Sequence, residues 1–264
     1  MVVTDVVALH RPNFEALECA MTAWPDIDLA VIGATALAIR GAPPARRSDD
    51  VDIAVAVGVH DLSEIGARLQ PPGWEAQRRM PHRWRHHARR LRLDIIPAGV
   101  PPGHERSLQL ARGLTIDVRG LEVAISSAEP VEVSCDGAPE LRLTPATPPL
   151  AVLVLLKMIA FIDKPALREM DATDVARVMH AYLPEMDDRR WEAPVSTLHD
   201  EDFKGAFALG VDMRPHLIPE YQTIVEAFAH DAVARGKMQR YWSTRPDAGN
   251  AAARAFLSGL DVGA

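Results

Sequence analysis

The pattern of apolar and polar positions changes partway along the chain. Up to about residue 146, short apolar runs typical of strands alternate with segments of helical spacing and with turns. From Pro148 to the end, apolar residues recur at helical spacing. The pattern predicts an α/β (α+β) protein. Residues 1–145 would form a small mixed β-sheet core flanked by helices, and residues 146–264 a C-terminal helical domain.

Within the first part, a helix is expected to begin at an Asn13 cap and to end before Pro25. The elements predicted after it are strands over 27–32 and 51–57, helices over 34–40 and 61–69, and a hairpin over 74–97 whose last strand is 91–96. Four more apolar runs are expected to be short strands, at 114–118, 121–126, 131–134 and 141–143.

Composition narrows the class of protein. The longest apolar run, 150–156, is shorter than the roughly 20 residues that a membrane span needs, and residues 1–9 lack the pattern of a secretory signal. Cys19 and Cys135 are the only cysteines, so neither a disulfide framework nor a zinc site is indicated. We therefore expect a cytoplasmic protein with no membrane partner. The net charge of −7 excludes a uniformly basic surface but leaves room for local basic patches.

Two carboxylates stand out in the second predicted strand. Asp50 and Asp52 are two residues apart, so their side chains would point to one face, about 6.6–6.8 Å apart along the strand. Val51, Ile53 and Val55 would then point to the opposite face, toward a core. Carboxylates placed side by side repel each other, and a divalent cation removes that repulsion. Mg²⁺ prefers oxygen ligands and commonly binds one or two carboxylates together with substrate phosphates.

A third carboxylate, Asp94, interrupts the apolar strand 91–96. An unpaired buried carboxylate is costly, so this position calls for a partner. If the two strands are neighbours, Asp94 completes a cluster with Asp50 and Asp52 that can hold two cations about 3.5–4 Å apart, the arrangement used for in-line attack on a nucleotide phosphate. The alternative is that residues 49–52 form a solvated acidic turn and Asp94 pairs with a nearby arginine.

Gly33 lies between a predicted strand and a predicted helix, shortly before Asp50. Glycine allows a tight turn that brings backbone N–H groups close to a ligand, and the start of the next helix favours anions. A single glycine between a strand and a helix is often only a turn. Its position just before the carboxylates favours a phosphate-binding role.

Residues 78–92 are dense in arginine and lead directly to Asp94. Arginines with an interleaved aromatic residue, here Trp84, suit phosphate backbones and exposed bases. The segment therefore favours an RNA acceptor, such as a tRNA end. The alternative is a solvated hairpin whose arginines balance the acidic excess of the chain. The histidines of this segment do not have zinc spacing and receive no role.

Taken together, these residues resemble the nucleotidyltransferases of the DNA polymerase β-like superfamily. The segments Gly33–Ala36, Arg47–Ile53 and Leu93–Ile95 look like the family pattern hG[GS]xA … R[ST]xDhDh … hDh. A later stretch, Leu155–Phe161 followed by Arg168–Asp174, is similar to the Leu-Lys … (Lys/Arg)-Asp-x-x-Asp signature of the AbiEii/AbiGii-type toxin nucleotidyltransferases. The resemblance covers about residues 28–180, and the last 80 or so residues match no pattern that we can name.

The resemblance implies roles for individual residues. Asp50, Asp52 and Asp94 would ligate Mg²⁺ or Mn²⁺, and Asp94 would also help to activate the acceptor hydroxyl. Lys157 would reach the nucleotide phosphates, and Asp171 would orient Lys157 or contact the nucleotide. The remaining positions implied to bind the nucleotide are Gly33, Ala34, Thr35, Arg47, Ser48 and Asp174.

Two positions depart from the family pattern, and a third has an alternative interpretation. Ala34 stands where the family usually has a second Gly or a Ser, and Met170 stands where a basic residue is common. These departures affect the nucleotide-binding details more than the metal site. Lys157 lies in a very apolar run, so it can also be a lysine that extends its charged end to solvent.

The activity implied by the resemblance is the metal-dependent transfer of a nucleoside monophosphate from an NTP, such as ATP, to an acceptor hydroxyl, an EC 2.7.7-type reaction. RNA is the acceptor that the basic segment favours, and the subfamily adds a role as the toxin of a toxin–antitoxin pair with an antitoxin partner. A protein or small-molecule acceptor is the alternative within enzymes. A non-catalytic nucleotide-binding regulatory module is the alternative outside them, and the presence of all three carboxylates argues against it.

Overall fold

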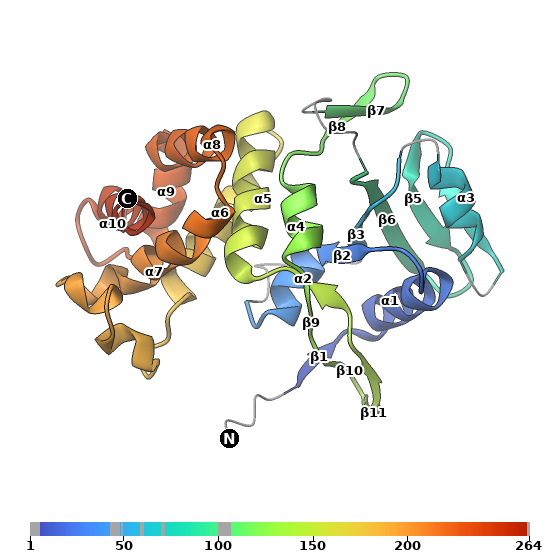
Figure 1. Cartoon of the computed structure of the whole chain (residues 1–264), viewed down its shortest axis with the longest axis horizontal. Helices are drawn as coiled ribbons and strands as arrows, with labels where there is room; N and C mark the ends of the chain where they lie inside the picture. Colours follow the sequence, from blue (N-terminus) through green and yellow to red (C-terminus); the bar gives the residue numbers. More distant parts are fainter. Residues whose placement is uncertain are drawn as a thin grey trace. The chain divides into compact units, whose positions relative to one another are not determined.

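A computed structural model shows two compact units, residues 1–153 and 154–264 (Figure 1). The division falls inside helix α5 (Leu150–Asp163). Strands dominate the first unit and helices the second, which confirms the predicted mixed fold class with helices at its C-terminal end. The residues described by the structure are 6–42, 48, 50–58, 61–69, 72–99 and 107–262.

A five-stranded mixed sheet forms the centre of the first unit. Its strand order is β2-β3-β6-β5-β4, and only β3 and β6 run parallel to each other. The predicted strands over 27–32, 51–57 and 91–96 are confirmed, and the predicted hairpin over 74–97 is a three-stranded antiparallel meander. The strands are β2 (Leu29–Ile32), β3 (Val51–Val55), β4 (Trp74–Gln77), β5 (Met80–His86) and β6 (Leu91–Pro97).

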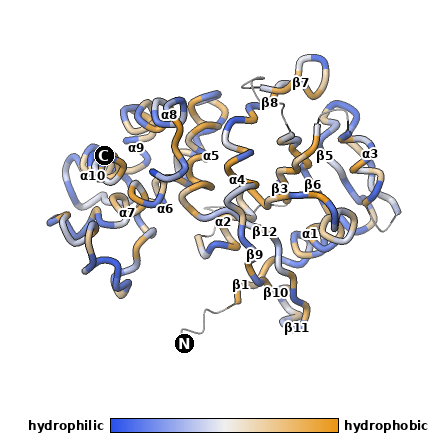
Figure 2. Tube along the Cα trace, viewed as in Figure 1, coloured by the Kyte–Doolittle hydropathy of each residue, from blue (hydrophilic) through white to orange (hydrophobic). Residues whose placement is uncertain are grey.

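Helices α1 (Arg11–Ala23) and α3 (Leu62–Ala67) pack against this sheet. The indole Nε1 of Trp24, which follows α1, donates a hydrogen bond to the carbonyl oxygen of Ile65 in α3, at 3.0 Å. Leu91, Leu93 and Ile95 are almost fully buried, and the strands β3 and β6 are coloured mainly as hydrophobic in Figure 2. Apolar burial of this kind is the main favourable term in forming such a sheet and its helices.

The start of α1 differs from the prediction. The helix begins at Arg11, with a proline in its first turn and His10 at the capping position, because proline is well suited to the first turn of a helix. Asn13 is therefore inside the helix and buried. Its amide Nδ2 donates hydrogen bonds to Thr35 Oγ1 at 3.3 Å and to the Ser48 carbonyl oxygen at 3.2 Å.

The prediction of a strand over 121–126 was wrong, because this segment is helix α4 (Leu121–Ser126). Gly120 has a φ of +80°, and its carbonyl oxygen accepts the first helical hydrogen bond from Ala124. A short apolar run is compatible with a buried strand and with a buried helix, so periodicity alone does not separate the two.

Smaller pieces complete the first unit. Helix α2 (Gly33–Ile39) follows β2 directly, and three small sheets surround the central one. The other three predicted strands, near 114–118, 131–134 and 141–143, are confirmed as β8, β10 and β11. The strands of the small sheets are β1 (Val7–Leu9), β7 (Ser107–Ala111), β8 (Leu114–Asp117), β9 (Glu129–Pro130), β10 (Val133–Cys135), β11 (Ala138–Leu143) and β12 (Ala146–Thr147).

The second unit is helical, as predicted for the C-terminal part. Phe161 and Phe228 meet edge-to-face in its core, with ring centroids 5.4 Å apart. No helix in the described part of the chain is long and apolar enough to cross a membrane. Besides the rest of α5, the unit contains α6 (Glu169–Ala181), α7 (Lys204–Met213), α8 (Pro219–His230), α9 (Ala232–Tyr241) and α10 (Ala248–Leu260), with short 3₁₀ turns between α6 and α8.

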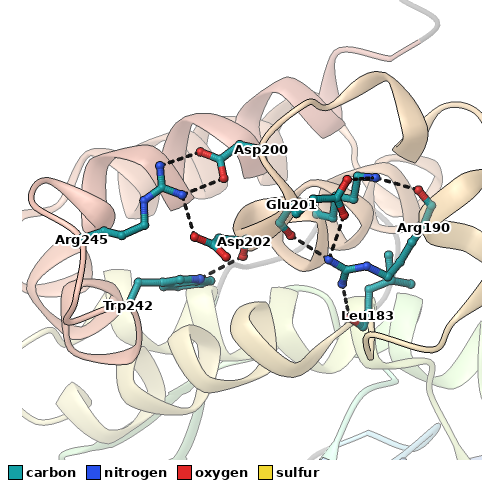
Figure 3. Close-up of polar contacts among 8 residues, drawn as sticks. Leu183, Arg190, Asp200, Glu201, Asp202, Trp242 and Arg245 are labelled. Atoms are coloured by element: carbon teal, nitrogen blue, oxygen red, sulfur yellow. Dashed lines mark hydrogen bonds and ion pairs between the residues drawn. The ribbon is translucent and has the colours of Figure 1, made fainter.

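An arginine ties the loop before α7 to the connection between α9 and α10 (Figure 3). The Arg245 guanidinium forms two hydrogen bonds with the Asp200 carboxylate, at 2.7 and 2.9 Å, and one with Asp202 at 2.7 Å. The Trp242 indole donates to the Asp202 carbonyl oxygen at 2.9 Å. These contacts give the loop a structural role, and none of their residues belongs to the predicted motifs.

Candidate active site

The register of the central sheet brings two of the predicted carboxylates together. Asp52 on β3 lies directly beside Asp94 on the parallel strand β6. On the other side of β3, Asp52 pairs with Ile32, the last residue of β2. Because paired residues of neighbouring strands place their side chains on the same face, Asp52 and Asp94 share one face of the sheet. We call this the carboxylate face.

The backbone of the glycine turn is in close contact with the Asp52 side chain. Gly33 follows Ile32 directly and has a φ of +68°, a conformation that residues with a side chain rarely adopt. A Cβ atom added to Gly33 would lie 2.2 Å from the Asp52 carboxylate oxygen Oδ2. The position therefore needs glycine for two separate reasons, and the backbone at the start of α2 is in direct contact with a carboxylate.

Asp50 accepts hydrogen bonds at both its side chain and its backbone carbonyl. The Ser48 hydroxyl donates a hydrogen bond to Asp50 Oδ1 at 2.5 Å. The Thr35 hydroxyl, which the resemblance implies to face the triphosphate, is buried and donates to the Asp50 carbonyl oxygen at 3.3 Å. Ala34, beside Gly33 in α2, is partly exposed, and Arg47 lies outside the described residues.

Arg83 on β5 is a site residue that the sequence did not single out. It lies directly across from Asp94 in the antiparallel pair β5/β6. Its guanidinium donates two hydrogen bonds to the Asp94 carboxylate, Nε to Oδ1 at 2.7 Å and Nη2 to Oδ2 at 2.5 Å. Nη2 also approaches Asp50 Oδ2 at 3.4 Å. One guanidinium thus connects two of the three predicted carboxylates.

The charge of Arg83 and the charges of the three carboxylates stabilise one another. The Asp94 side chain is only 6 % exposed, so its charge depends on a partner inside the protein. Hydrogen bonding to Asp94 raises the pKa of Arg83 above its ordinary value, and the charges of Asp94, Asp50 and Asp52 act in the same direction, against the effect of partial burial. Arg83 therefore remains a permanent positive charge among the three carboxylates.

The three predicted carboxylates do not all serve equally well as ligands of a divalent metal ion. In the portion of the chain that the structure describes, no three His, Cys, Asp or Glu side chains lie close enough to share a metal ion. Both oxygens of Asp94 already accept hydrogen bonds from Arg83. Asp52 on β3 and Asp50 just before that strand offer two further carboxylates, which is the number that Mg²⁺ commonly takes. A divalent ion would therefore be held by Asp50 and Asp52.

The basic segment 78–92 divides between the two faces of the sheet. Arg85 pairs with Arg92 across β5 and β6, two residues along each strand from the Arg83–Asp94 pair. Because side chains alternate between the two faces of a strand, these arginines share the carboxylate face. Arg85 Nε is buried without a hydrogen-bond partner among the described residues. Like charges directly opposite each other are unfavourable, and an anion bound between them would remove the repulsion.

The aromatic part of the RNA prediction is corrected by the structure. Trp84 alternates with the arginines of β5 and therefore points to the other face, where it is buried. A Cβ atom added to Gly66 of α3 would lie 1.9 Å from the Trp84 ring, so the indole packs on this helix. Trp84 is not available to stack on a base, and of this segment Arg83, Arg85 and Arg92 are the arginines that share the carboxylate face.

The remaining predicted residues meet one another in the second unit. Lys157 on α5 is buried, and its Nζ atom lies 2.8 Å from Asp171 Oδ1 and 2.9 Å from Asp174 Oδ2, both on α6. Burial opposes the charged form, but the two carboxylates outweigh it and raise the pKa of Lys157 above its ordinary value. Lys157 does not extend to solvent; it is the centre of a buried ion triplet.

Comparisons with known proteins add little to this geometry. No protein-family model and no curated protein matches the chain. Among solved structures, the chain aligns with the antibiotic-resistance factor ANT(2'')-Ia at 13 % identity, over 62 % of this chain and 80 % of that one, with a TM-score of 0.39. It aligns with JHP933 from Helicobacter pylori at 12 % identity, over 94 % and 91 % of the two chains, with a TM-score of 0.41. TM-scores below 0.5 do not define a shared fold or activity, so the functional assignment depends on the residues themselves.

Proposed function

We propose that this protein is a metal-dependent nucleotidyltransferase that moves a nucleoside monophosphate from an NTP to an acceptor hydroxyl. The observation that carries the proposal is the pairing of Asp52 with Asp94 on parallel strands, with Gly33 pressed against Asp52. A glycine turn in contact with one of two paired strand carboxylates is the combination that the sequence motifs imply. Glycine adopts the positive φ without strain and leaves room for Asp52, where a Cβ atom would not fit.

In this proposal Asp50 and Asp52 hold one Mg²⁺ or Mn²⁺ ion. The ion, when bound, neutralises charge on the phosphates and helps to fix the α-phosphate for attack. Ser48 keeps the Asp50 carboxylate in position through its hydrogen bond, and Asp94 fixes the Arg83 guanidinium beside Asp50. The backbone at Gly33 and Ala34 lies at the edge of this group, where the triphosphate would bind.

The reaction needs positioning and charge neutralisation more than covalent chemistry by the protein. The acceptor oxygen forms a bond to the α-phosphorus, the bond from this phosphorus to the pyrophosphate oxygen breaks, and the hydroxyl proton passes to solvent water. Arg83 supplies a fixed positive charge at the place where negative charge is concentrated. In the second unit, Asp171 and Asp174 hold the Nζ atom of the buried Lys157, so this cluster serves the stability of that unit.

The acceptor that we propose is RNA. Arg85 and Arg92 lie on the carboxylate face next to the Arg83–Asp94 pair, and arginines suit phosphate groups because their planar donors bind two oxygens at once. The support is electrostatic and concerns the phosphate backbone, since Trp84 is buried and does not contribute base stacking. A protein or small-molecule acceptor is the outcome to distinguish experimentally.

A toxin role is the more specific form of the proposal. It is supported by the Lys157–Asp171–Asp174 cluster, which corresponds to the subfamily signature. Expression of the chain is then expected to arrest growth, and Asp52→Asn is expected to relieve the arrest. Normal growth with the wild-type chain would remove the toxin role and leave the reaction untouched.

The reaction is tested by incubating the protein with Mg²⁺, total cellular RNA and each α-³²P-labelled NTP in turn. Label is expected on RNA with at least one nucleotide and not with Asp50→Asn. Asp136→Asn is the matched control, because it removes an exposed carboxylate of the same unit in the turn between β10 and β11. Label on protein or on a small molecule would replace the RNA acceptor, and no transfer to any acceptor class would refute the proposed reaction.

A further inference from the structure

The Arg83 guanidinium bridges Asp94 and Asp50 on the carboxylate face. We infer that its guanidinium replaces one of the two metal ions that a three-carboxylate site can hold. The site then binds a single divalent ion per chain, at Asp50 and Asp52, and Asp94 serves as the anchor of Arg83 rather than as a metal ligand. This inference rests on the proposed function and specifies how the same site carries its positive charge.

The first support is the geometry of the pair. Arg83 and Asp94 are directly opposed on neighbouring strands of one sheet, so their contact is fixed by the strand register and not by the path of a loop. Two parallel N–H···O hydrogen bonds join them, at 2.7 and 2.5 Å. Bidentate pairs of this kind are among the strongest side-chain hydrogen bonds in proteins.

The second support is the reach of the same guanidinium to Asp50. Nη2 donates to Asp94 Oδ2 and also lies 3.4 Å from Asp50 Oδ2. A cation that bridges two carboxylates is what a second metal ion would provide in a two-ion site. Arg83 provides this bridge from within the chain.

The third support is burial. The Asp94 side chain is 6 % exposed and the Arg83 side chain 24 % exposed. A metal ion that used Asp94 would either lie beside the positive charge of the guanidinium or displace it and leave an arginine charge without its main partner. Breaking a buried pair in this way is strongly unfavourable, so a metal ion does not compete effectively for Asp94.

The test is a count of protein-bound Mn²⁺ by electron paramagnetic resonance, with the four non-hydrolysable NTP analogues present and a protein-free sample as reference. The wild-type chain is expected to bind one ion per chain. Arg83→Gln frees Asp94 and is expected to bind two, whose close spacing adds a coupled-pair signal. Arg85→Gln is the matched control, since it removes the next arginine on the same face, opposite Arg92, and it is expected to bind one.

The melting temperature gives a second test that does not depend on counting bound ions. Arg83→Gln is expected to lower the melting temperature more than Arg85→Gln does, and Mn²⁺ is expected to restore more of that loss than it adds to the wild type. Two ions in the wild type, or one ion and no restoration in Arg83→Gln, would overturn the inference while the proposed function stands. No bound ion in any of these proteins would remove the proposed metal site and the inference with it. Two ions in the wild type would overturn the inference even if Arg83→Gln does not fold.

Discussion

Asp52 and Asp94 are register partners on two adjacent parallel strands, β3 and β6. They are far apart in the sequence, and the parallel pairing alone places their carboxylates on one face. This pairing brings negative charges together, which opposes folding unless positive charge is supplied. Arg83 supplies it to Asp94, and in our account a divalent ion supplies it to Asp50 and Asp52.

Asp52→Asn and Asp50→Asn are expected to abolish transfer. The substitutions keep the shape of the side chain but remove the charge that binds the ion, and losses on the order of 100-fold or more are typical when charge stabilisation is removed from such a site. The measurement is the rate of NMP transfer, compared with Asp136→Asn. A loss smaller than about tenfold in both site variants, which corresponds to about 1.4 kcal/mol, would contradict the assignment.

Gly33→Ala tests the contact between the glycine turn and Asp52. Gly33 and Gly113 have similar positive φ angles, +68° and +77°, so a side chain at either position costs about 1 kcal/mol or more in backbone strain. Only at Gly33 would the new Cβ atom also collide with Asp52, since Gly113 has no atom within 4 Å of that point among the described residues.

We therefore expect Gly33→Ala to weaken Mn²⁺ binding and transfer strongly, while Gly113→Ala lowers the free energy of unfolding and leaves both properties unchanged. Chemical denaturation and an Mn²⁺ titration of the two variants make the comparison. Equal Mn²⁺ affinity in the two variants would mean that the contact with Asp52 has no influence on the site.

The central strands and their carboxylates were predictable because strand alternation is a local property. Asp52 and Asp94 interrupt apolar runs, Asp50 stands two residues before Asp52, and both features are visible in the sequence alone. The alternative that Asp94 pairs with a nearby arginine is confirmed, but the sequence did not identify Arg83 as that arginine, because the pairing depends on which residues of β5 and β6 lie opposite each other. The signal was present: a four-residue turn over 87–90 pairs residue 86 with residue 91 and hence residue 83 with residue 94.

Two other predictions failed for different physical reasons. The apolar run 121–126 has the length of a strand and of a helix, and the turn at Gly120 directs it into α4. Asn13 has the chemistry of a helix cap, but the proline in the first turn starts α1 earlier. The asparagine is then used inside the fold, where it joins α1 to Thr35 and to the Ser48 backbone. Competition between such local signals is resolved only by packing.

The arginine pair on the carboxylate face predicts a salt-dependent affinity for RNA. Each arginine that contacts a phosphate of single-stranded RNA contributes about 0.7 to the slope of log K against log salt concentration. The double variant Arg85→Gln, Arg92→Gln is therefore expected to lower this slope by about 1.4. Arg142→Gln is the control, because Arg142 is an exposed arginine of the same unit that pairs with Glu132. An unchanged slope in the double variant would exclude the pair from RNA binding.

Lys157→Met is expected to destabilise the second unit. It leaves Asp171 and Asp174 buried without their main counter-charge, and breaking a buried ion pair typically costs 3–5 kcal/mol, so we expect about 3 kcal/mol. The lower end is chosen because Arg168 and Arg177 remain near the two carboxylates, at 3.7 and 3.6 Å. Denaturant unfolding measures the change.

The same triplet predicts a pH dependence. The pKa of Lys157 is raised in the folded state above its ordinary value of 10.5, so its contribution to stability is fully present below that pH. The contribution is lost as the pH rises through the folded-state pKa, and the wild type should therefore lose stability at alkaline pH more steeply than Lys157→Met. Lys164→Met, at an exposed lysine just after α5, serves as the control and should behave as the wild type does. Parallel curves for the wild type and Lys157→Met would contradict the role of the triplet.

The most direct test of the account is a crystal structure with Mn²⁺ and a non-hydrolysable NTP, analysed by anomalous scattering at the manganese edge. We expect an Mn²⁺ peak at coordination distance, about 2.0–2.2 Å, from oxygens of Asp50 and Asp52, with the triphosphate beside Gly33 and the Arg83 guanidinium still on Asp94. A triphosphate bound elsewhere, with no metal ion at Asp50 and Asp52, would contradict the assignment of this face as the site of nucleotidyl transfer.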